Sequence, residues 1–268
     1  MAASADIGQE LRAWRTRRRL SQLDLALDAG ISTRHLSFIE TGRSQPRREM
    51  LLRILRQLDV PFREQNALLL AAGFAPAFPE RPLDDPELAP VRAALDLILR
   101  GHDPHPAVVV DRHWNLVAAN ATLMAMVALA DVDPALLEPP VNVLRAGLHP
   151  RGLAPLLVNL DDWLGHFRAR LSSQVAASGD EFLADLLEEI SSYPGGGSEA
   201  RATSEVLGPL KARAPDGREL SFLGLFATFD TPFEVTASEL AIELLYPTDE
   251  ATRAALADFA RERGEAGG

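Results

Sequence analysis

The segment SQLDLALDAGISTRHLSFIETGRSQP, residues 21–46, restricts the local fold more than any other part of the chain. Ser21 followed by Asp24 is an aspartate version of a capping box, which predicts the start of a helix. Gly30 predicts the end of that helix, and Ser32 predicts the N-cap of a second short helix over 33–40. Two short helices joined by a glycine-containing turn form a helix-turn-helix, although an ordinary helical hairpin in an all-α domain is the alternative at this point.

Apolar spacing predicts which side of each helix faces the core. We expect Leu23, Ala26 and Leu27 to be buried in the first helix, and Leu36 and Ile39 in the second. The outward side of the second helix carries polar residues that are able to reach base edges in DNA, namely Thr33, Arg34, His35 and Ser37.

Charge is distributed unevenly along the chain. Of its 268 residues, 47% are apolar and 24% are charged, the proportions of a globular protein with a sizeable core. Residues 1–76 hold 12 arginines, no lysine and 8 acidic residues, a balance of +4, whereas residues 77–268 hold 15 basic and 30 acidic residues, a balance of −15. In a chain of net charge −11 this asymmetry predicts that the two parts have different functions. The basic part, residues 1–76, is the candidate nucleic-acid contact.

Composition excludes several classes of site and protein. The chain has no cysteine, which excludes disulfides, thiolate zinc sites and a cysteine nucleophile. No apolar run reaches the roughly 18 residues that span a bilayer. The first twenty residues lack the apolar stretch of a secretory signal. We therefore expect a cytoplasmic protein with no membrane insertion.

A proline-rich, acidic stretch over 72–87, AGFAPAFPERPLDDPE, predicts a short and fairly stiff connector. It divides the chain into an expected N-terminal domain at 1–76, a linker at 77–86 and a second domain at 87–265. The N-terminal domain is expected to contain five helices, at 7–18, 22–29, 33–40, 47–58 and 62–72.

The second domain is expected to combine helices with an antiparallel sheet. The Asp216-Gly217 pair is a hairpin signal. Residues 239–246 alternate as in a strand, although Thr236 and Glu239 would equally cap a helix, and we favour the strand. Helices are predicted at 87–100, 121–129, 134–192 with interruptions, and 249–263, strands at 107–110, 115–118, 203–214, 218–230 and 235–247, and a loop at 193–200.

These elements predict an α+β fold with two domains. A five-helix, all-α helix-turn-helix domain precedes a PAS-like five-stranded antiparallel sheet with helices. In a PAS-like domain the sheet and helices enclose an apolar cavity.

The N-terminal segment closely resembles the helix-turn-helix of XRE-family regulators, which are related to phage repressors. The resemblance covers residues 7–74 and depends on LSQLDLA, AGISTRHLSFIETGRSQP and LDVP occurring together and in register. It implies a double-stranded DNA operator as partner. It also implies a homodimer, because two recognition helices must enter successive major grooves roughly 34 Å apart.

The family pattern implies roles for individual residues. Thr33, Arg34 and Ser37 would face bases. Phe38 would either contact a thymine methyl or only pack, and Glu40 would tie the recognition helix to its neighbours. The remaining candidate DNA contacts are His35, on the same helix, and Gln22, Arg43, Ser44, Arg15 and Arg18, on the phosphates.

Residue patterns typical of catalysis are absent from the sequence. It has no Gly-x-Ser-x-Gly elbow, Walker A loop, dinucleotide fingerprint or HExxH motif. Pro104 separates His102 from His105, and solvated loop histidines are the simpler interpretation of this pair. Adjacent carboxylates at 161–162 and 188–189 point in different directions on a helix. We therefore expect no enzyme activity, no catalytic residue and no metal site.

Residues 85–258 resemble the ligand-binding domain of MmyB/MltR-like regulators, through VVVDRHWNLVAAN, NVLRAGLHPRGL, VNLDDW and ELSFLGLFATFDTPFEVTASELAIELLYP. The pairing with an XRE-type N-terminus is that family's own arrangement. The resemblance implies a PAS-like sensor with no required cofactor and with a bound fatty acid or similar apolar ligand. The candidate lining residues, which would equally fill a core, are Met124, Met126, His149, Trp163, Phe167, Phe182, Phe222 and Phe226.

Two functions stay open at this point. The first is a sequence-specific, DNA-binding transcriptional regulator whose C-terminal domain dimerises and senses a small apolar ligand. In the second, the C-terminal domain is only a dimerisation or partner-protein interaction module without a ligand.

Overall fold

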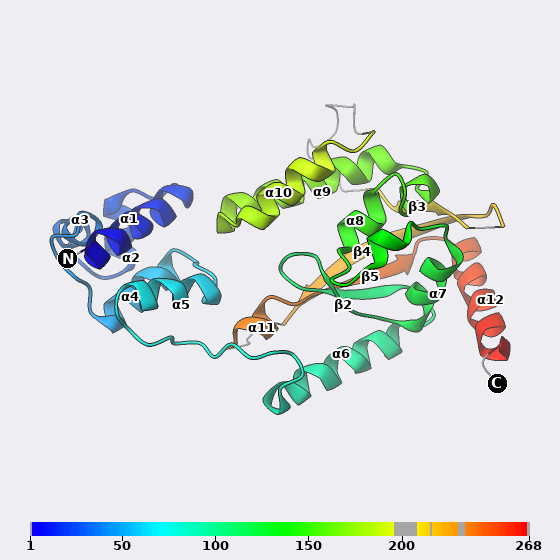
Figure 1. The fold of residues 1–268 in the computed structure, drawn as a ribbon, viewed down its shortest axis with the longest axis horizontal. Coiled ribbons are helices and arrows are strands. Elements are labelled where there is room, and N and C mark those ends of the chain that lie inside the picture. Colours follow the sequence, from blue (N-terminus) through cyan, green and yellow to red (C-terminus); the bar gives the residue numbers. More distant parts are fainter. Residues whose placement is uncertain (1, 196–207, 215, 230–233, 267–268) are drawn as a thin grey trace. The chain divides into compact units, whose positions relative to one another are not determined.

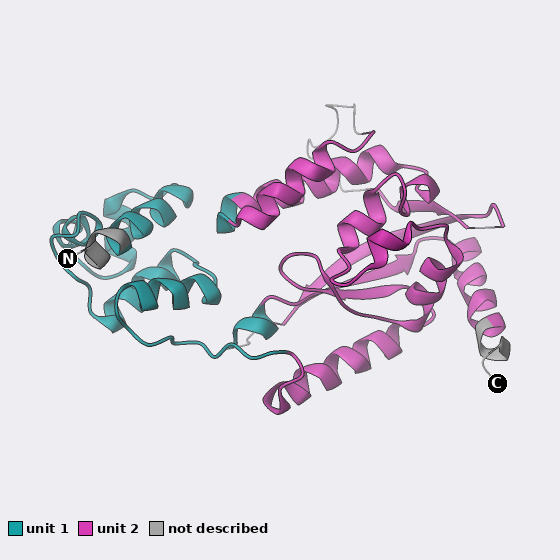
Figure 2. Cartoon of the chain, viewed as in Figure 1, with its two compact units in different colours: residues 1–82, 176–179, 231–238 teal, residues 83–175, 180–230, 239–268 magenta. Residues whose placement is uncertain are grey.

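The chain is divided into two compact units in a computed structural model that describes residues 2–195, 208–214, 216–229 and 234–266 (Figure 2). Unit 1 consists of residues 1–82 with two short later segments, 176–179 and 231–238. Unit 2 consists of residues 83–175, 180–230 and 239–268. The domain boundaries expected from the sequence stay predictions.

Unit 1 is built from five short helices around one apolar core. The core includes Leu11, Leu25, Leu36 and Ile54, whose side chains are fully buried. In order along the chain the helices are α1 (Ala2–Arg17), α2 (Gln22–Asp28), α3 (Thr33–Glu40), α4 (Arg48–Gln57) and α5 (Phe62–Ala71). The helices expected from the sequence are therefore confirmed, with boundaries that differ by a few residues.

Side-chain caps fix the start of each of the two helices in the predicted helix-turn-helix. Ser21 Oγ accepts a hydrogen bond from the Asp24 amide, and the Asp24 carboxylate accepts one from the Ser21 amide, so the predicted capping box is present. The hydrogen bonds from Ser21 lower the pKa of the Asp24 carboxyl. Ser32 Oγ caps α3 by accepting from the His35 amide. Gly30 takes a φ of 61°, a left-handed conformation that glycine adopts without steric cost.

The buried side of α2 differs from the prediction. Leu25 and Ala26 are buried as the core-facing residues, whereas Leu23 is 64% exposed and Leu27 is 77% exposed. The fully buried residues Leu25 and Ala29 lie one turn apart, so the stripe that faces α3 and α4 is rotated from the expected one. This helix carries two apolar stripes, one with Leu23 and Leu27 and one with Leu25 and Ala29. Packing against the neighbouring helices determines which of them is buried.

The connector contains no helix or strand between Gly73 and Asp85, as its composition predicts. Its first part is nevertheless fixed within unit 1. The Asn66 side chain accepts hydrogen bonds from the amides of Ala77 and Phe78 and donates one to the Phe78 carbonyl. The Phe62 and Phe78 rings stack with centroids 4.0 Å apart.

Unit 2 contains a five-stranded antiparallel sheet with the strand order β2-β1-β5-β4-β3. The strands are β1 (Ala107–Val110), β2 (Leu116–Ala119), β3 (Leu210–Arg213), β4 (Glu219–Thr228) and β5 (Ala241–Pro247). The longest pairing joins β4 to β5 and runs from Phe222 opposite Pro247 to Thr228 opposite Ala241. Asp216 and Gly217 lie in the connection from β3 to β4, which confirms the hairpin.

Helices cover the two faces of this sheet unequally (Figure 1). On one face, here called the outer face, Leu95 and Leu99 of α6 pack against Val109 and Ile242. On the opposite, inner face, α9 packs Trp163 and Phe167 against the sheet. The covering elements are η1 (Pro86–Leu88), α6 (Ala89–His102), α7 (Ala121–Leu129), η2 (Pro134–Leu137), α8 (Val143–Leu148), η3 (Ala154–Leu156), α9 (Leu160–Ser178), α10 (Glu181–Ser191) and α12 (Glu250–Ala266).

The segment 235–247, predicted as one strand, divides into a helical turn and a strand. Helix α11 (Val235–Ser238) comes first, and β5 begins at Ala241. The Glu234 carboxylate accepts a hydrogen bond from the Ala237 amide at 2.7 Å, which caps this turn as an N-cap side chain does. The strand that we favoured for 239–246 is thus confirmed only from Ala241 onward. Residues 203–207 of the predicted strand 203–214 and residues 196–200 of the predicted loop lie outside the described residues.

Helices α1 and α3 approach each other so closely that only glycine fits at position 8. A methyl group on Gly8 would lie 2.5 Å from the Ile39 carbonyl oxygen and 2.7 Å from that of Glu40. Because backbone atoms cannot move aside as a flexible side chain does, we expect Gly8→Ala to lower the free energy of unfolding of unit 1 by about 1–3 kcal/mol. The measurement is urea unfolding followed by circular dichroism.

The matched control is Gly165→Ala in α9. A methyl group on Gly165 meets no atom within 4 Å, so this change should be neutral or stabilising by up to about 1 kcal/mol. Equal stability of the Gly8→Ala variant and the wild type would contradict the close approach.

Candidate DNA interface and ligand cavity

The predicted base-reading residues lie together on one side of α3. Leu36 and Ile39 face the core, which leaves Arg34 exposed and Thr33 and Ser37 half-buried on the other side. A short helix with this division suits insertion into a major groove, where base edges present donors and acceptors.

Two arginines flank the ring of Phe38. The Arg34 guanidinium carbon lies 5.3 Å from the ring centroid and that of Arg43 lies 6.0 Å from it. Phe38 itself is half-buried. Contacts of this kind orient the guanidinium groups and leave their N–H donors available. The choice between a thymine contact and simple packing for Phe38 stays open.

A buried carboxylate joins three helices beneath this surface. Glu40, whose side chain is 1% exposed, accepts hydrogen bonds from Arg15 Nε at 2.7 Å and from Arg15 Nη2 at 3.0 Å. Gln22 Nε2 donates to the same carboxylate at 2.7 Å. The hydrogen bonds to Glu40 raise the pKa of Arg15. Glu40 therefore ties α3 to α1 and α2, which is the structural role expected for it.

Three of the predicted phosphate contacts are already engaged inside the protein. Arg15 and Gln22 are bound to Glu40. Arg18 Nε donates to the Leu58 carbonyl at 2.8 Å and Arg18 Nη2 to the Asp59 carbonyl at 2.6 Å. The DNA contacts of these three residues stay predictions. Some of the N–H donors that would bind phosphate already form hydrogen bonds within the protein. The other candidates outside α3 are Arg43, which is exposed, and Ser44, which is half-buried.

Unit 2 contains an apolar cavity of about 310 Å³ between the inner face of the sheet and the helices that cover it. Its walls come from α7, η3, β3, β4, β5 and α12. Polar side chains, including Arg213, Asp216 and Arg218, occur only as a minority among the lining residues. The apolar lining is formed by Pro106, Leu123, Met126, Val127, Leu129, Ala130, Leu153, Leu156, Leu157, Leu210, Ala212, Ala214, Leu220, Phe222, Leu245, Ala255, Leu256 and Phe259.

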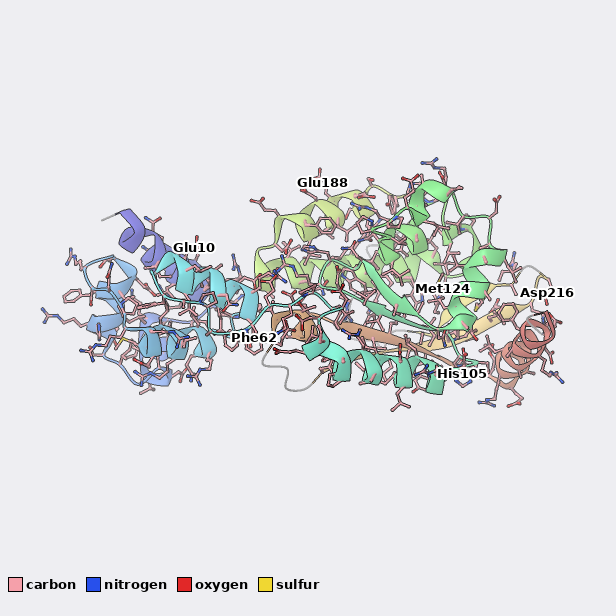
Figure 3. The ribbon with its side chains drawn as sticks, turned by 60° about the horizontal axis from the view of Figure 1, so that its bottom comes forward. Glu10, Phe62, His105, Met124, Glu188 and Asp216 are labelled. Atoms are coloured by element: carbon pink, nitrogen blue, oxygen red, sulfur yellow. The ribbon has the colours of Figure 1, made fainter. Side chains whose placement is uncertain are left out.

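Two of the eight predicted lining residues, Met126 and Phe222, line this cavity. Met124, which is labelled in Figure 3 and lies on the same helix as Met126, is 51% exposed and is not among the residues that line the cavity. Phe222 is almost fully buried and reaches the cavity from β4. The two methionines of α7 therefore differ in position although the sequence treats them alike.

The other predicted residues form separate clusters. Phe167 and Phe226 meet the Trp114 ring on the inner face of the sheet, and the Trp163 ring packs against that of Phe167, with centroids 5.6 Å apart. The remaining two contact neighbouring aromatic rings, Phe182 that of His113 at 4.5 Å and His149 that of Tyr193 at 5.1 Å. The aromatic residues are thus mainly core.

Sequence reasoning missed the contribution of the last helix and of η3. Leu256 and Phe259 of α12 line the cavity from one side, and Leu156 and Leu157 line it from another. Helix α12 was predicted, but nothing in its sequence indicated which part of the fold its apolar side would cover. A signal for this contact was therefore not available from spacing alone.

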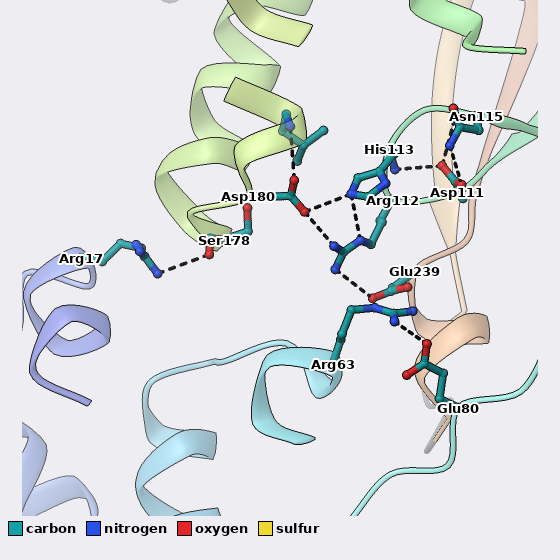
Figure 4. A network of polar contacts seen from close by, with 11 residues as sticks. Arg17, Arg63, Glu80, Asp111, Arg112, His113, Asn115, Ser178, Asp180 and Glu239 are labelled. Atoms are coloured by element: carbon teal, nitrogen blue, oxygen red, sulfur yellow. Dashed lines mark hydrogen bonds and ion pairs between the residues drawn. The ribbon is translucent and has the colours of Figure 1, made fainter. Parts of the chain in front are cut away.

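A polar network joins Arg112 and His113 to Asp180 and Glu239, the two residues at which later segments of unit 2 begin (Figure 4). Asp180, the N-cap of α10, pairs with Arg112 Nη2 at 2.8 Å and with His113 Nε2 at 3.0 Å, and Arg112 Nη1 lies 3.5 Å from Glu239. Burial favours a raised pKa for Asp180, but the hydrogen bonds from His113 and the Leu183 amide, with the charge of Arg112, outweigh burial and lower the pKa.

The described part of the chain also bears on metal sites and on membrane-spanning helices. Within it, no group of three or more His, Asp or Glu side chains is placed to hold a metal ion. No described helix is long and apolar enough to cross a membrane. The expectations of no metal site and no enzyme activity stay expectations.

Family comparisons match both parts of the chain. Residues 91–258 match the model described as "MmyB-like transcription regulator ligand binding domain", and residues 11–65 match a helix-turn-helix model. Each match lies within the region that resembles the same family in sequence, 85–258 for the first and 7–74 for the second. A search of curated proteins gives no significant match.

Two solved structures show only a distant likeness. The clp gene regulator ClgR from Corynebacterium glutamicum is 23% identical, with 39% of this chain and 96% of that chain covered and a TM-score of 0.24. An RNA-binding light-oxygen-voltage receptor is 15% identical, with 97% of this chain and 65% of that chain covered and a TM-score of 0.27. At such TM-scores neither likeness bears on the function of this chain.

Removal of the charge that balances Glu40 should destabilise unit 1. Arg15→Met keeps an aliphatic side chain but leaves the buried carboxylate with Gln22 as its side-chain partner. We expect a loss of about 3 kcal/mol in the free energy of unfolding, measured by urea denaturation, because an uncompensated buried charge is costly.

The control Arg12→Met removes the same charge from the exposed side of α1 and should change stability by less than about 0.5 kcal/mol. Similar losses in the two variants would show that Glu40 does not depend on Arg15.

Proposed function

The chain belongs to the family of regulators that carry an MmyB-like ligand-binding domain after an XRE-type helix-turn-helix, and from this premise we propose that unit 2 senses a small, fatty-acid-like molecule and so controls DNA binding by unit 1. A DNA-binding transcription regulator is the function that the two matched families share. Four further points are proposals: the identity of the ligand, its effect on DNA binding, the homodimer and a cytoplasmic location.

The apolar cavity of unit 2 is the observation that carries this proposal. It lies within the matched ligand-binding domain, apart from Phe259 and Glu262 at its edge, and most of its lining residues are aliphatic. Ligand sites for small molecules are typically concave, mostly apolar and supplied with few polar groups. A hydrocarbon chain fits such a lining because it gains free energy from leaving water and needs no hydrogen-bond partner. The PAS-like description of this unit stays a prediction.

An interaction module without a ligand is the second candidate. The outer face of the sheet supports it, because Leu223, Leu225 and Tyr246 are exposed, with Leu223 opposite Tyr246 on neighbouring strands. Exposed apolar side chains of this kind are common in protein interfaces. Extraction of the purified protein followed by mass spectrometry separates the two candidates. A stoichiometric acyl chain supports the sensor, and an empty, stable dimer that no lipid stabilises supports the interaction module.

A homodimer on a palindromic operator follows from the proposed DNA contact. A single α3 covers one major groove, and two copies are needed to read half-sites one helical turn apart. The exposed apolar residues of the outer sheet face are available to join two copies. Under this proposal two protein chains bind each operator duplex.

The ligand alters DNA binding only if it binds differently to the DNA-competent and DNA-incompetent arrangements. The connector and the helix that follows it are one candidate route. The network of Arg112 is another, because Asp180 and Glu239 directly follow the segments 176–179 and 231–238, which belong to unit 1.

Arg34 is the residue chosen to test sequence-specific DNA binding, because it is exposed on α3 and an arginine fork is suited to pair with the edge of a guanine. On a duplex selected from a random library with the wild-type protein, Arg34→Ala should weaken binding by about 1–3 kcal/mol. A gel-shift titration at fixed salt measures this change and the expected stoichiometry of two chains per duplex.

Arg100→Ala, which removes the same charge from an exposed position on α6, is the control and should leave this affinity nearly unchanged. Unchanged affinity of the Arg34→Ala variant would remove Arg34 from the base-reading residues.

The cavity is tested by the two methionines of α7. Met126→Trp should fill part of the cavity and weaken binding of dodecanoate at least about tenfold, because the added ring competes for the same space. Met124→Trp places the same side chain at an exposed position and should not change the affinity. Isothermal titration calorimetry measures both. Equal effects of the two substitutions would contradict dodecanoate binding in this cavity.

A further inference from the structure

The charged residues that line the apolar cavity gather at one part of its wall. Arg213, Asp216 and Arg218 come from the end of β3 and the connection to β4, and Glu262 comes from α12. Every other lining residue is apolar. The two sides meet, because Arg218 Nη1 lies 3.9 Å from Asp258 Oδ2 of α12. We call Arg213, Asp216, Arg218 and Glu262 the polar edge of the cavity.

The polar edge is the part of the cavity wall that is in contact with water. All four of its residues are exposed, whereas the apolar lining residues are buried or half-buried, with Leu129 as the exception. A hydrocarbon chain gains free energy by leaving water, and a charged head group loses free energy unless it stays hydrated or is paired. An amphiphile in this cavity is therefore oriented, with its chain inside and its head group at the polar edge.

The cation of the polar edge that is open to a ligand is Arg213. Arg218 Nε donates to Asp216 Oδ2 at 2.6 Å, and Lys211 Nζ lies 3.2 Å from Glu219 Oε1. Glu219 is the residue opposite Arg213 in the β3–β4 ladder, so its carboxylate is already engaged by Lys211. Within the described residues Arg213 makes no ion pair and no side-chain hydrogen bond.

The position of Arg213 suits the binding of an anion. Its backbone is part of the cavity wall, because Ala212 and Ala214 on either side of it also line the cavity. The pairing of β3 with β4, which includes Arg213 opposite Glu219, holds this part of the wall. A guanidinium group carries its N–H donors in a planar fork that matches the two oxygens of a carboxylate.

Glu262 is the competing charge at the polar edge. It also makes no ion pair among the residues that the structure describes, and it would attract a cationic head group. It follows Phe259, the last apolar lining residue of α12, by nearly one turn, whereas Arg213 has lining residues on both sides. The group closer to the apolar interior is therefore the cation.

We propose that Arg213 binds the anionic head group of an amphiphile whose hydrocarbon chain occupies the cavity, a carboxylate being the simplest such group. The head group lies at the polar edge, and the chain extends toward Met126 of α7 and Leu156 of η3. This inference depends on the proposed ligand-binding function and names the residue that selects the head group at that same site.

The test compares decanoate, decanol and decylammonium, which share one hydrocarbon chain and differ in charge. Isothermal titration calorimetry at neutral pH measures their affinities. The wild type should bind decanoate about fivefold more tightly than decanol, the gain of a well-formed ion pair at an exposed arginine. It should bind decylammonium no more tightly than decanol.

Arg213→Gln should lower the affinity for decanoate to that for decanol and leave the affinity for decanol unchanged. Arg253→Gln is the matched control, because it removes the same charge from an exposed residue of α12 that does not line the cavity. This control should keep the preference for decanoate. Thermal unfolding followed by circular dichroism should give both variants the midpoint of the wild type.

A second measurement needs no substitution. In the wild type the preference for decanoate over decanol should shrink when salt is raised from about 0.05 M to about 1 M, because salt screens an exposed ion pair. A preference that does not change with salt would contradict the pairing with Arg213.

The failures of the two proposals are distinguishable. If the wild type binds decanoate and decanol equally, or if Arg213→Gln keeps the preference for decanoate, the role of Arg213 is wrong and the ligand-binding function stands. Tightest binding of decylammonium would overturn the role of Arg213 in favour of Glu262. If none of the three probes binds, the ligand-binding function itself is contradicted.

Discussion

The pairing of β4 with β5 is the constraint on which unit 2 depends. Its register places Phe222, Gly224 and Phe226 on the inner face beside Glu243 and Leu245, and places Leu223 and Leu225 on the outer face. Because side chains alternate along a strand, a slip of one residue would exchange the two sets. The apolar cavity on the inner face and the exposed apolar residues on the outer face both follow from this single register.

In unit 1 a buried ion pair has a comparable role. Glu40 closes the end of α3 and accepts donors from α1 and α2, so the recognition helix is held by side-chain hydrogen bonds as well as by apolar packing. Gly8 allows the backbones of α1 and α3 to approach closely. Buried pairs of this kind fix geometry more than they add stability, since their desolvation offsets much of their attraction. The orientation of Arg34 and Ser37 thus depends on residues that never contact DNA.

Local signals were sufficient for much of the fold. Ser21, Asp24 and Ser32 predicted the caps of α2 and α3, and Asn120 caps α7 in the same way. The strands predicted at 107–110, 115–118, 218–230 and 235–247 correspond to β1, β2, β4 and β5, with small differences in their ends for the first three. Where two local patterns competed, the sequence was not sufficient. Leu23 and Leu27 were expected inside α2 but are exposed, and residues 235–238 form a turn of helix where a strand was expected, because Glu234 caps it. Of the predicted ligand residues, Met126 and Phe222 line the cavity, and the part that any of them has in ligand binding stays a prediction.

The sequence by itself determined the helix-turn-helix, the division of charge and the family of both parts, because these depend on neighbouring residues and on motifs of fixed spacing. Only the tertiary structure decided which apolar residues enclose a cavity and which fill a core, because that depends on contacts between distant segments. Met124 and Met126 are two residues apart and equally apolar, yet packing against η3, β4 and α12 gives only Met126 a place in the cavity wall. The same packing brings Glu243, Trp163 and Gly224 together from three elements that no local pattern connects.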